Sequence, residues 1–332
     1  MTHPPLPTLP EIEAAAAVVY REFQATPQYR WALLSERLGT DCWVKHENHT
    51  PVGAFKIRGG LCYFDQMARS GTLPQAIISA TRGNHGQSMG WAARVHGIPC
   101  SIVVPLGNSV EKNAAMRALG VTLIEHGADF QDAREHAIQL AVQTGAHMVP
   151  SFHPALLLGV STYWWELFRA VPQLDVVYVP IGLGSGACAA IAAKLALGHR
   201  ARIVGVVSTL ATTYADSLAA GHVVAAPVST VLADGMAVRL ADAGALAILS
   251  QHLDHVVQVS DAEVAQAMRD PTPTPTTWPR APVPPASPPP CRSAPSCAAR
   301  WWVPRCAAVM WTPMCSPGCW LAAADDTRLL CS

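Results

Sequence analysis

Short apolar runs recur along the first 269 residues, each bounded by polar residues or glycine. A run of about five apolar residues is typical of a strand in a parallel sheet that is covered on both faces. The pattern predicts strands over residues 77–79, 101–105, 121–125, 176–180, 203–207 and 255–259.

Longer stretches lie between these runs and repeat their apolar residues at helical spacing. Several end at a glycine, which is the common residue just after a helix. They predict helices over residues 87–96, 110–119, 129–144 and 187–197, and an amphipathic helix over 11–23 precedes the first run. Strand and helix in alternation predict an α/β fold with parallel-rich sheets flanked by helices.

The composition excludes several classes of protein. Half of the residues are hydrophobic and 14% are charged, and the formal net charge is zero. We therefore expect neither a nucleic-acid nor a membrane-surface partner. No apolar run approaches the roughly 20 residues of a spanning helix, and the first ten residues do not resemble a signal peptide. The expectation is a cytoplasmic protein with free thiols at Cys42, Cys62, Cys100 and Cys188.

The character of the sequence changes at about Asp270. The last 62 residues hold 14 of the 28 prolines and five of the ten tryptophans, and they contain no Lys, Glu or His. A proline-rich linker seldom holds so much tryptophan and cysteine. We expect an irregular tail over 270–332 with few helix or strand signals, and no metal site within it.

Lys56 is one of four lysines in the chain and follows the turn Thr50-Pro-Val-Gly53. An amine at the start of a helix lies near the positive end of the helix dipole, which lowers its pKa. A lowered pKa is what a lysine needs to bond covalently to a carbonyl group. Taken alone, however, a surface lysine is the more frequent case.

Two glycine-containing turns each join a predicted strand to a predicted helix. The first is Thr81-Arg-Gly-Asn-His-Gly-Gln87, whose backbone N–H groups suit a substrate carboxylate. The second is Gly182-Leu-Gly-Ser-Gly186, which is typical of a phosphate cradle. It lacks the Lys-Ser/Thr ending of a nucleoside-triphosphate loop and the glycine spacing of a dinucleotide site.

Together these three segments resemble the fold-type II pyridoxal-phosphate enzymes, which include the β-subunit of tryptophan synthase, and in particular the serine/threonine dehydratases. The resemblance runs from about Leu33 to Met268. It implies that pyridoxal 5'-phosphate is the cofactor, that Lys56 bonds to it and that Phe55 is the usual neighbour of this lysine. The segment Ala233-Asp-Gly-Met-Ala-Val238 resembles a further part of the family's site.

The same resemblance implies roles for the residues of both turns. Gly182, Leu183, Gly184, Ser185 and Gly186 would bind the cofactor phosphate. Asn84 would bond the cofactor's ring hydroxyl. The substrate would be bound by residues that follow one another in the first turn: Thr81, Arg82, Gly83, Asn84 and His85.

Two features depart from relatives that racemise serine. Those relatives carry a serine as a second base at the position of Arg82, and arginine stays protonated in proteins. This favours elimination over racemisation, and Arg82 is expected either to attract the substrate carboxylate or to pair with an acid at the surface. Those relatives also bind a divalent cation through an acidic residue after the strand at 203–207, where this chain has no acid before Asp216. No metal is therefore expected.

The tail departs most from the family. Codons that could encode residues 273–285 can also be read from one nucleotide earlier, and the peptide that they then encode can contain Glu-Gly-Ala-Gly. Codons for residues 306–312, shifted in the same way, can encode Cys-Gly-Gly-Asn-Val-Asp. Both resemble family segments and occur in the family's order. We hypothesise that the chain is a frameshifted translation from about Asp270 onward. The family's own segment would then be missing, so that part of the core surface would be exposed and the ring nitrogen of the cofactor would lack its hydrogen-bond partner.

The sequence thus predicts a two-domain enzyme. Residues 1–52 begin the large domain, 53–152 form a small α/β domain, 153–269 form the large cofactor-binding domain and 270–332 form the tail. The predicted activity is a threonine dehydratase that also acts on L-serine, with a possible homodimer as its assembly. Dehydration of another β-hydroxy amino acid, serine racemisation and a non-catalytic remnant remain alternatives, and a nicotinamide-dependent oxidoreductase is the weakest of the rivals.

Overall fold

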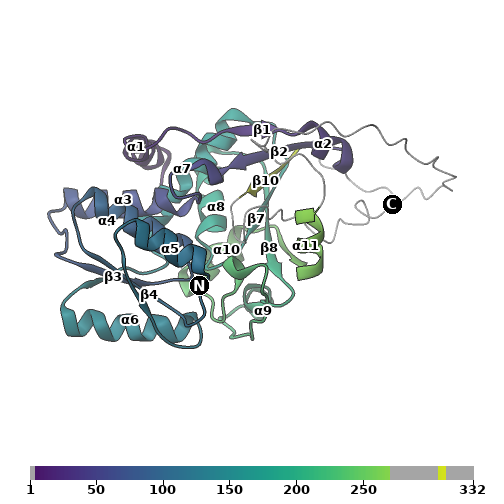
Figure 1. Ribbon diagram of the computed structural model, residues 1–332. Helices are drawn as coiled ribbons and strands as arrows, with labels where there is room; N and C mark the ends of the chain where they lie inside the picture. Colours follow the sequence, from purple (N-terminus) through teal and green to yellow (C-terminus); the bar gives the residue numbers. More distant parts are fainter. Residues whose placement is uncertain (1–3, 270–305, 312–332) are drawn as a thin grey trace, which may run out of the picture.

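The structure is a computed structural model that describes residues 4–269 and 306–311 (Figure 1). Two sheets organise it. The larger sheet has six strands, in the order β1 (Gln28–Arg30), β2 (Asp41–His46), β10 (Cys306–Trp311), β7 (Val176–Pro180), β8 (Arg202–Ser208) and β9 (His255–Val259). All neighbouring strands in it are parallel except β1 and β2, which are antiparallel.

The smaller sheet is parallel throughout. Its four strands follow the order β5 (Thr122–Glu125), β4 (Cys100–Val104), β3 (Ile77–Ala80) and β6 (His147–Met148). The predicted fold class is therefore confirmed, and so are the six strands predicted from apolar runs, with boundaries that shift by one residue at most.

Helices cover both faces of the smaller sheet (Figure 1). Their bounds in this half of the molecule are α3 (Lys56–Arg69), α4 (Asn84–Val95), α5 (Val110–Ala118) and α6 (Phe130–Thr144). One face packs its apolar side chains on α3, α4 and α5, through a cluster that includes Phe64, Met89 and Met116. The other face packs on the alanines of α6.

The larger sheet packs its main core against the central helices α7 (Pro154–Ala170) and α8 (Ser185–Leu197), which are buried along most of their length. The other helical elements of this half are α1 (Leu9–Val19), α2 (Ala32–Leu38), η1 (Glu47–His49), α9 (Thr213–Ala220), η2 (Asp234–Met236), α10 (Ala243–His252) and α11 (Asp261–Arg269). Trp164 and Tyr163 of α7 are fully buried in this core, where Ile12 of α1 joins them. Helix α1 corresponds to the helix predicted over 11–23, but it begins at Leu9 and ends at Val19, earlier at both ends than expected.

Strand β10 corrects one expectation about the tail. Few strand signals were expected after Asp270, yet Cys306–Trp311 lies between β2 and β7 and pairs with both. The segment therefore completes the larger sheet at its middle. The rest of the tail, and with it most of the frameshift hypothesis, lies outside the described residues.

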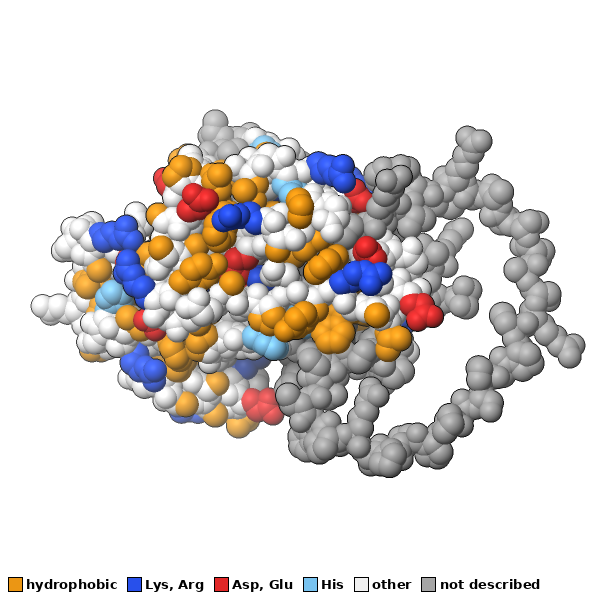
Figure 2. Space-filling model, turned by 90° about the horizontal axis from the view of Figure 1, so that it is seen from above, with side chains coloured by type: hydrophobic (Ala, Val, Ile, Leu, Met, Phe, Trp, Pro, Cys, Tyr) orange, Lys and Arg blue, Asp and Glu red, His pale blue; other side chains and the backbone are white. Residues whose placement is uncertain are grey.

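Charged side chains show no gathering of one sign on the face seen in Figure 2, where lysine, arginine, aspartate and glutamate lie scattered among hydrophobic side chains. Within the described ranges, no helix combines the length and the apolar character needed to cross a membrane. The four cysteines of residues 4–269 are free and buried.

Candidate active site

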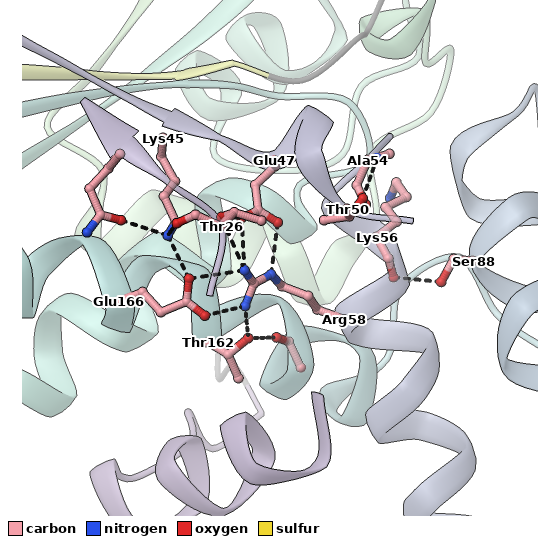
Figure 3. Close-up of polar contacts among 12 residues, drawn as sticks. Thr26, Lys45, Glu47, Thr50, Ala54, Lys56, Arg58, Ser88, Thr162 and Glu166 are labelled. Atoms are coloured by element: carbon pink, nitrogen blue, oxygen red, sulfur yellow. Dashed lines mark hydrogen bonds and ion pairs between the residues drawn. The ribbon is translucent and has the colours of Figure 1, made fainter. Parts of the chain in front are cut away.

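Lys56 opens helix α3 directly after a tight turn. Gly53 adopts a φ of +66°, which favours glycine, and the Thr50 hydroxyl closes the turn. It accepts a hydrogen bond from the Ala54 N–H at 2.8 Å and donates one to the Ala54 carbonyl at 3.0 Å. From the neighbouring helix α4, Ser88 Oγ donates to the Lys56 carbonyl at 2.6 Å (Figure 3). The main chain of Lys56 is thus held from two sides.

The amine of Lys56 lies beside the glycine-rich turn that follows β7. Its Nζ is 3.3 Å from Ser185 Oγ, and it lies 5.4 Å from the centre of the Phe55 ring. Burial disfavours the charged form and lowers the pKa of Lys56 to about 8. At a pKa of about 8 roughly a tenth of such amines are unprotonated at pH 7, a far larger share than for an exposed lysine.

The turn from Gly182 to Gly186 leaves no room for side chains at two of its glycines. A Cβ on Gly182 would lie 2.3 Å from the Gly235 carbonyl oxygen. Gly184 has a φ of +98°, and a Cβ there would lie 2.8 Å from the Cβ of Ala245. The Tyr214 hydroxyl fixes the turn by donating to the Leu183 carbonyl at 2.8 Å. A rigid bare turn at the N-terminus of a 13-residue helix fits a phosphate.

The first turn, over residues 81–87, lies at the end of β3 and leads into α4. The Gly83 N–H donates to Thr81 Oγ1 at 3.0 Å, and Asn84 is the first residue of the helix. Burial and the neighbouring Lys56 amine lower the pKa of His85 to about 3, so its imidazole is neutral at physiological pH. The Nε of Arg82 and the Nε2 of His85 are buried and have no hydrogen-bond partner within the described residues.

One pocket brings together Lys56, the predicted residues Thr81 to His85 and Leu183, whereas Gly182, Gly184, Ser185 and Gly186 of the other turn do not line it. It lies where β3 and β7 end, at the carboxyl edges of the two sheets, which is where open α/β sheets bind ligands. The residues that line it are Phe55, Lys56, Thr81, Arg82, Gly83, Asn84, His85, Lys112, Phe130, Ser151, Leu183, Asp234, Gly235, Ala237 and Val238. Another hollow, between the ends of α4 and α5, holds none of the predicted site residues.

Lys112 was missed by sequence reasoning, although it is one of only four lysines in the chain. It comes from α5, and its ammonium forms an ion pair with Asp234 across the pocket. The stem of Lys112 covers the first turn, because a Cβ on Gly83 would lie 2.7 Å from its Cδ. Asp234 belongs to the segment 233–238 that the resemblance had indicated. Arg239 and Asp129, which do not line the pocket, form another ion pair at 2.6 Å.

A metal site is not formed by the described residues, since no three His, Cys, Asp or Glu side chains among them cluster closely enough to hold an ion. The polar side chains that line the pocket are instead the amines of Lys56 and Lys112, the guanidinium of Arg82, the amide of Asn84, the imidazole of His85, the hydroxyls of Thr81 and Ser151 and the carboxylate of Asp234. These residues fit a cofactor that carries a phosphate and an aldehyde. The glycine-rich turn accommodates the phosphate, and Lys56 can reach an aldehyde placed beside Ser185.

Comparison with known proteins points the same way. Residues 19–270 match the family described as "Pyridoxal-phosphate dependent enzyme". The biosynthetic L-threonine dehydratase of Haemophilus influenzae is 32% identical over 76% of this chain and 49% of the relative. The L-threonine ammonia-lyase of Geobacter sulfurreducens is 34% identical over 70% of this chain and 58% of the relative. The chain thus spans about half the length of the curated relatives it matches.

Solved structures show the same fold. The processed form of threonine deaminase isoform 2 from Solanum lycopersicum superposes with a TM-score of 0.71 at 26% identity, covering 81% of this chain and 80% of that one. Maize serine racemase superposes with a TM-score of 0.74 at 24% identity, covering 80% of each chain. At that identity the second likeness concerns the fold alone. The predicted family resemblance is confirmed by these matches.

Proposed function

The chain belongs to the family of pyridoxal-phosphate dependent enzymes, and on that basis we propose that it is an ammonia-lyase acting on β-hydroxy amino acids. The proposed substrate is L-threonine, which would first lose water to give an enamine. The enamine would then take up water and release ammonia to give 2-oxobutanoate, so that the net loss is one ammonia, and L-serine would give pyruvate in the same way. The names of the relatives from Haemophilus influenzae and Geobacter sulfurreducens support this choice of substrate.

The observation that carries the proposal is the placement of Lys56. Its Nζ lies 3.3 Å from Ser185 in the glycine-rich turn, and the start of α4 lines the same pocket. When bound, pyridoxal phosphate supplies an aldehyde for covalent attachment and a ring that takes up the electrons released at the substrate's α-carbon. Lys56 Nζ would accept the α-proton, because its lowered pKa keeps part of the amine unprotonated near neutral pH.

The two turns would bind different groups, one the cofactor phosphate and the other the substrate carboxylate. Gly182, Gly184 and Gly186 would present backbone N–H groups to the cofactor phosphate, with Leu183 and Ser185 completing that turn. Asn84 would orient the cofactor ring. The N–H groups at the start of α4, with Thr81, would bind the substrate carboxylate, and Arg82 would add charge attraction to it.

Elimination is favoured over racemisation by the residue types in the pocket. Racemisation needs a second base on the face of the substrate opposite Lys56. Arg82 lines the pocket at the position where racemising relatives carry that base, and its guanidinium stays protonated. His85 is neutral, and serves in this proposal as a substrate-binding group.

The test combines a spectrum with product analysis. Purified chain supplied with pyridoxal phosphate should show a visible absorption band that changes when L-threonine is added, while 2-oxobutanoate accumulates. Lys56→Ala should abolish both, whereas Lys194→Ala, on the half-exposed side of α8, should abolish neither. Formation of D-serine from L-serine without pyruvate would favour racemisation. Absence of any band in the unaltered chain would identify a non-catalytic remnant.

A further inference from the structure

We propose that Arg58 is a positioning residue, which holds the first turn of α3 so that the Lys56 amine faces Ser185. Arg58 lies two residues after Lys56 in the same helical turn. At about 100° per residue the two side chains leave the helix on roughly opposite sides. Lys56 therefore lines the pocket, while Arg58 points toward Glu47 and Glu166, as Figure 3 shows. The catalytic consequence of this arrangement rests on the proposed function.

Arg58 is completely buried and is bonded on all sides. Its Nε and Nη2 donate to the two carboxylate oxygens of Glu47 at 2.8 and 3.0 Å. Its Nη1 and Nη2 donate to the two carboxylate oxygens of Glu166 at 2.6 and 3.1 Å. Nη1 also donates to Thr162 Oγ1 at 3.0 Å. Paired two-point contacts of this kind fix the plane of a guanidinium as well as its position.

The cluster is balanced in charge, because Lys45 joins it. Lys45 Nζ donates to Glu166 Oε2 at 2.6 Å and to the Thr26 carbonyl at 2.7 Å. Two cations thus face two carboxylates, and all four side chains are at least 96% buried. Burial opposes ionisation of Glu166, but the charges of Arg58 and Lys45 outweigh it and hold the pKa of this carboxyl below its usual value.

This cluster connects α3 to parts of the chain that are otherwise remote from Lys56. Glu47 belongs to η1 and Lys45 to β2, while Glu166 belongs to the central helix α7. The backbone of α7 also packs tightly on the same turn, because a Cβ on Gly159 would lie 2.1 Å from the Arg58 carbonyl oxygen. The first turn of α3 is thereby fixed to the larger sheet and its core.

Helix α3 needs such an anchor at its start. Its N-cap residue is Phe55, whose side chain cannot accept a hydrogen bond from the first free N–H groups, and no side-chain capping bond is present. An uncapped first turn loosens readily, and Lys56 is the first residue of that turn. The charge cluster adds to the restraint that the Thr50 turn and the Ser88 hydrogen bond give to this turn.

The test compares two Arg→Met variants at opposite ends of α3. Arg58→Met removes the anchor. Arg69→Met removes an exposed ion pair with Asp65 in the last turn of the same helix. Cofactor-free protein is treated with a small amine-acylating reagent across a pH series, and modification of each lysine is read by peptide mass. Lys194 serves as the internal reference on another helix.

The unaltered chain and Arg69→Met should show half-maximal Lys56 labelling near pH 8. In Arg58→Met the midpoint should rise by at least one pH unit toward the ordinary 10.5 of lysine, because a loosened turn lets water reach the amine. In the presence of cofactor, kcat for L-threonine should fall about 100-fold with KM changed much less, since misplacement of the reacting amine affects the chemical step.

A folded Arg58→Met protein with an unchanged Lys56 midpoint and unchanged kcat would overturn the proposal, whatever its loss of thermal stability. If this variant does not fold, Arg58→Lys and Glu47→Gln preserve the size of the cluster and are judged by the same midpoint. The labelling needs no cofactor and no turnover. A chain that shows the Lys56 shift but never converts threonine would therefore refute the proposed function and leave the positioning role standing.

Discussion

Replacing Gly184 by alanine is expected to damage both the fold and the cofactor site, for reasons that can be separated. Gly184 has a φ of +98°, and an added Cβ would lie 2.8 Å from the Cβ of Ala245 and 3.2 Å from the Tyr214 hydroxyl. The backbone conformation alone costs a non-glycine residue about 1–2 kcal/mol. Inserting a methyl group into a filled space costs about 1–3 kcal/mol more. The free energy of unfolding should therefore fall by about 2–5 kcal/mol.

Gly198, at the other end of α8, is the matched control. It also has a positive φ, of +62°, but nothing lies within 4 Å of the position of an added Cβ. Gly198→Ala should cost only the backbone part, about 1–2 kcal/mol. At about 2–4 °C per kcal/mol for a domain of this size, Gly184→Ala should melt about 2–12 °C below Gly198→Ala in calorimetry.

The affinity for the cofactor should also differ between the two variants. If the crowded turn loses one backbone hydrogen bond to the phosphate, worth about 1.5–3 kcal/mol, the Kd for pyridoxal phosphate should rise about 10- to 100-fold in Gly184→Ala. It should not change in Gly198→Ala. Equal melting temperatures and equal Kd values for the two variants would show that the turn is neither crowded nor a phosphate site, and the reasoning would fail.

Three further predictions concern the charged groups of the pocket. Arg82→Ala should raise KM for L-threonine about tenfold with little change in kcat, and an unaltered KM would remove Arg82 from substrate binding. The rate of covalent cofactor attachment should rise about tenfold per pH unit up to a pH of about 8 and level off above it, because only the unprotonated Lys56 amine reacts. The rate is measured by stopped-flow absorbance, and a rate that does not change with pH would contradict the lowered pKa. Between pH 6.5 and about 3 the unfolded chain binds a proton at His85 that the folded chain does not, so stability should fall as pH falls. At pH 5 this loss should be about 2 kcal/mol larger in the unaltered chain than in His85→Asn, and parallel denaturation curves would argue against it.

Much of the fold was predictable because apolar runs in a parallel sheet are covered on both faces. Strands β7 and β9 coincide with the predicted ranges, and the turns after β3 and β7 carried the signals of the site. Helix α7 gave no comparable signal. It is buried around most of its surface, so it lacks the polar stripe by which an amphipathic helix is recognised.

The contacts that complete the site join residues remote in sequence. Lys112 and Asp234 are 122 positions apart, and Arg58 and Glu166 are 108 apart. Neither pairing leaves a local pattern, because it depends on how the two sheets pack. Strand β10 was missed for another reason: Cys306–Trp311 is an apolar run of six residues, but the proline-rich composition around it led to the expectation of an irregular tail.

The domain boundaries at residues 53 and 153, the homodimer and the cytoplasmic location remain predictions. The frameshift from about Asp270 is another, and sequencing of the gene together with the mass of the purified protein decides it. An uninterrupted frame through residue 332 would refute it.

The covalent bond at Lys56 can be measured directly. The chain is incubated with pyridoxal phosphate, reduced with borohydride and digested, and the peptide that carries the added mass is identified. Of the four lysines in the chain, Lys56 alone should carry the label in stoichiometric amount. Stoichiometric label on Lys112, or no label on any lysine while the protein is folded, would contradict the assignment of the site.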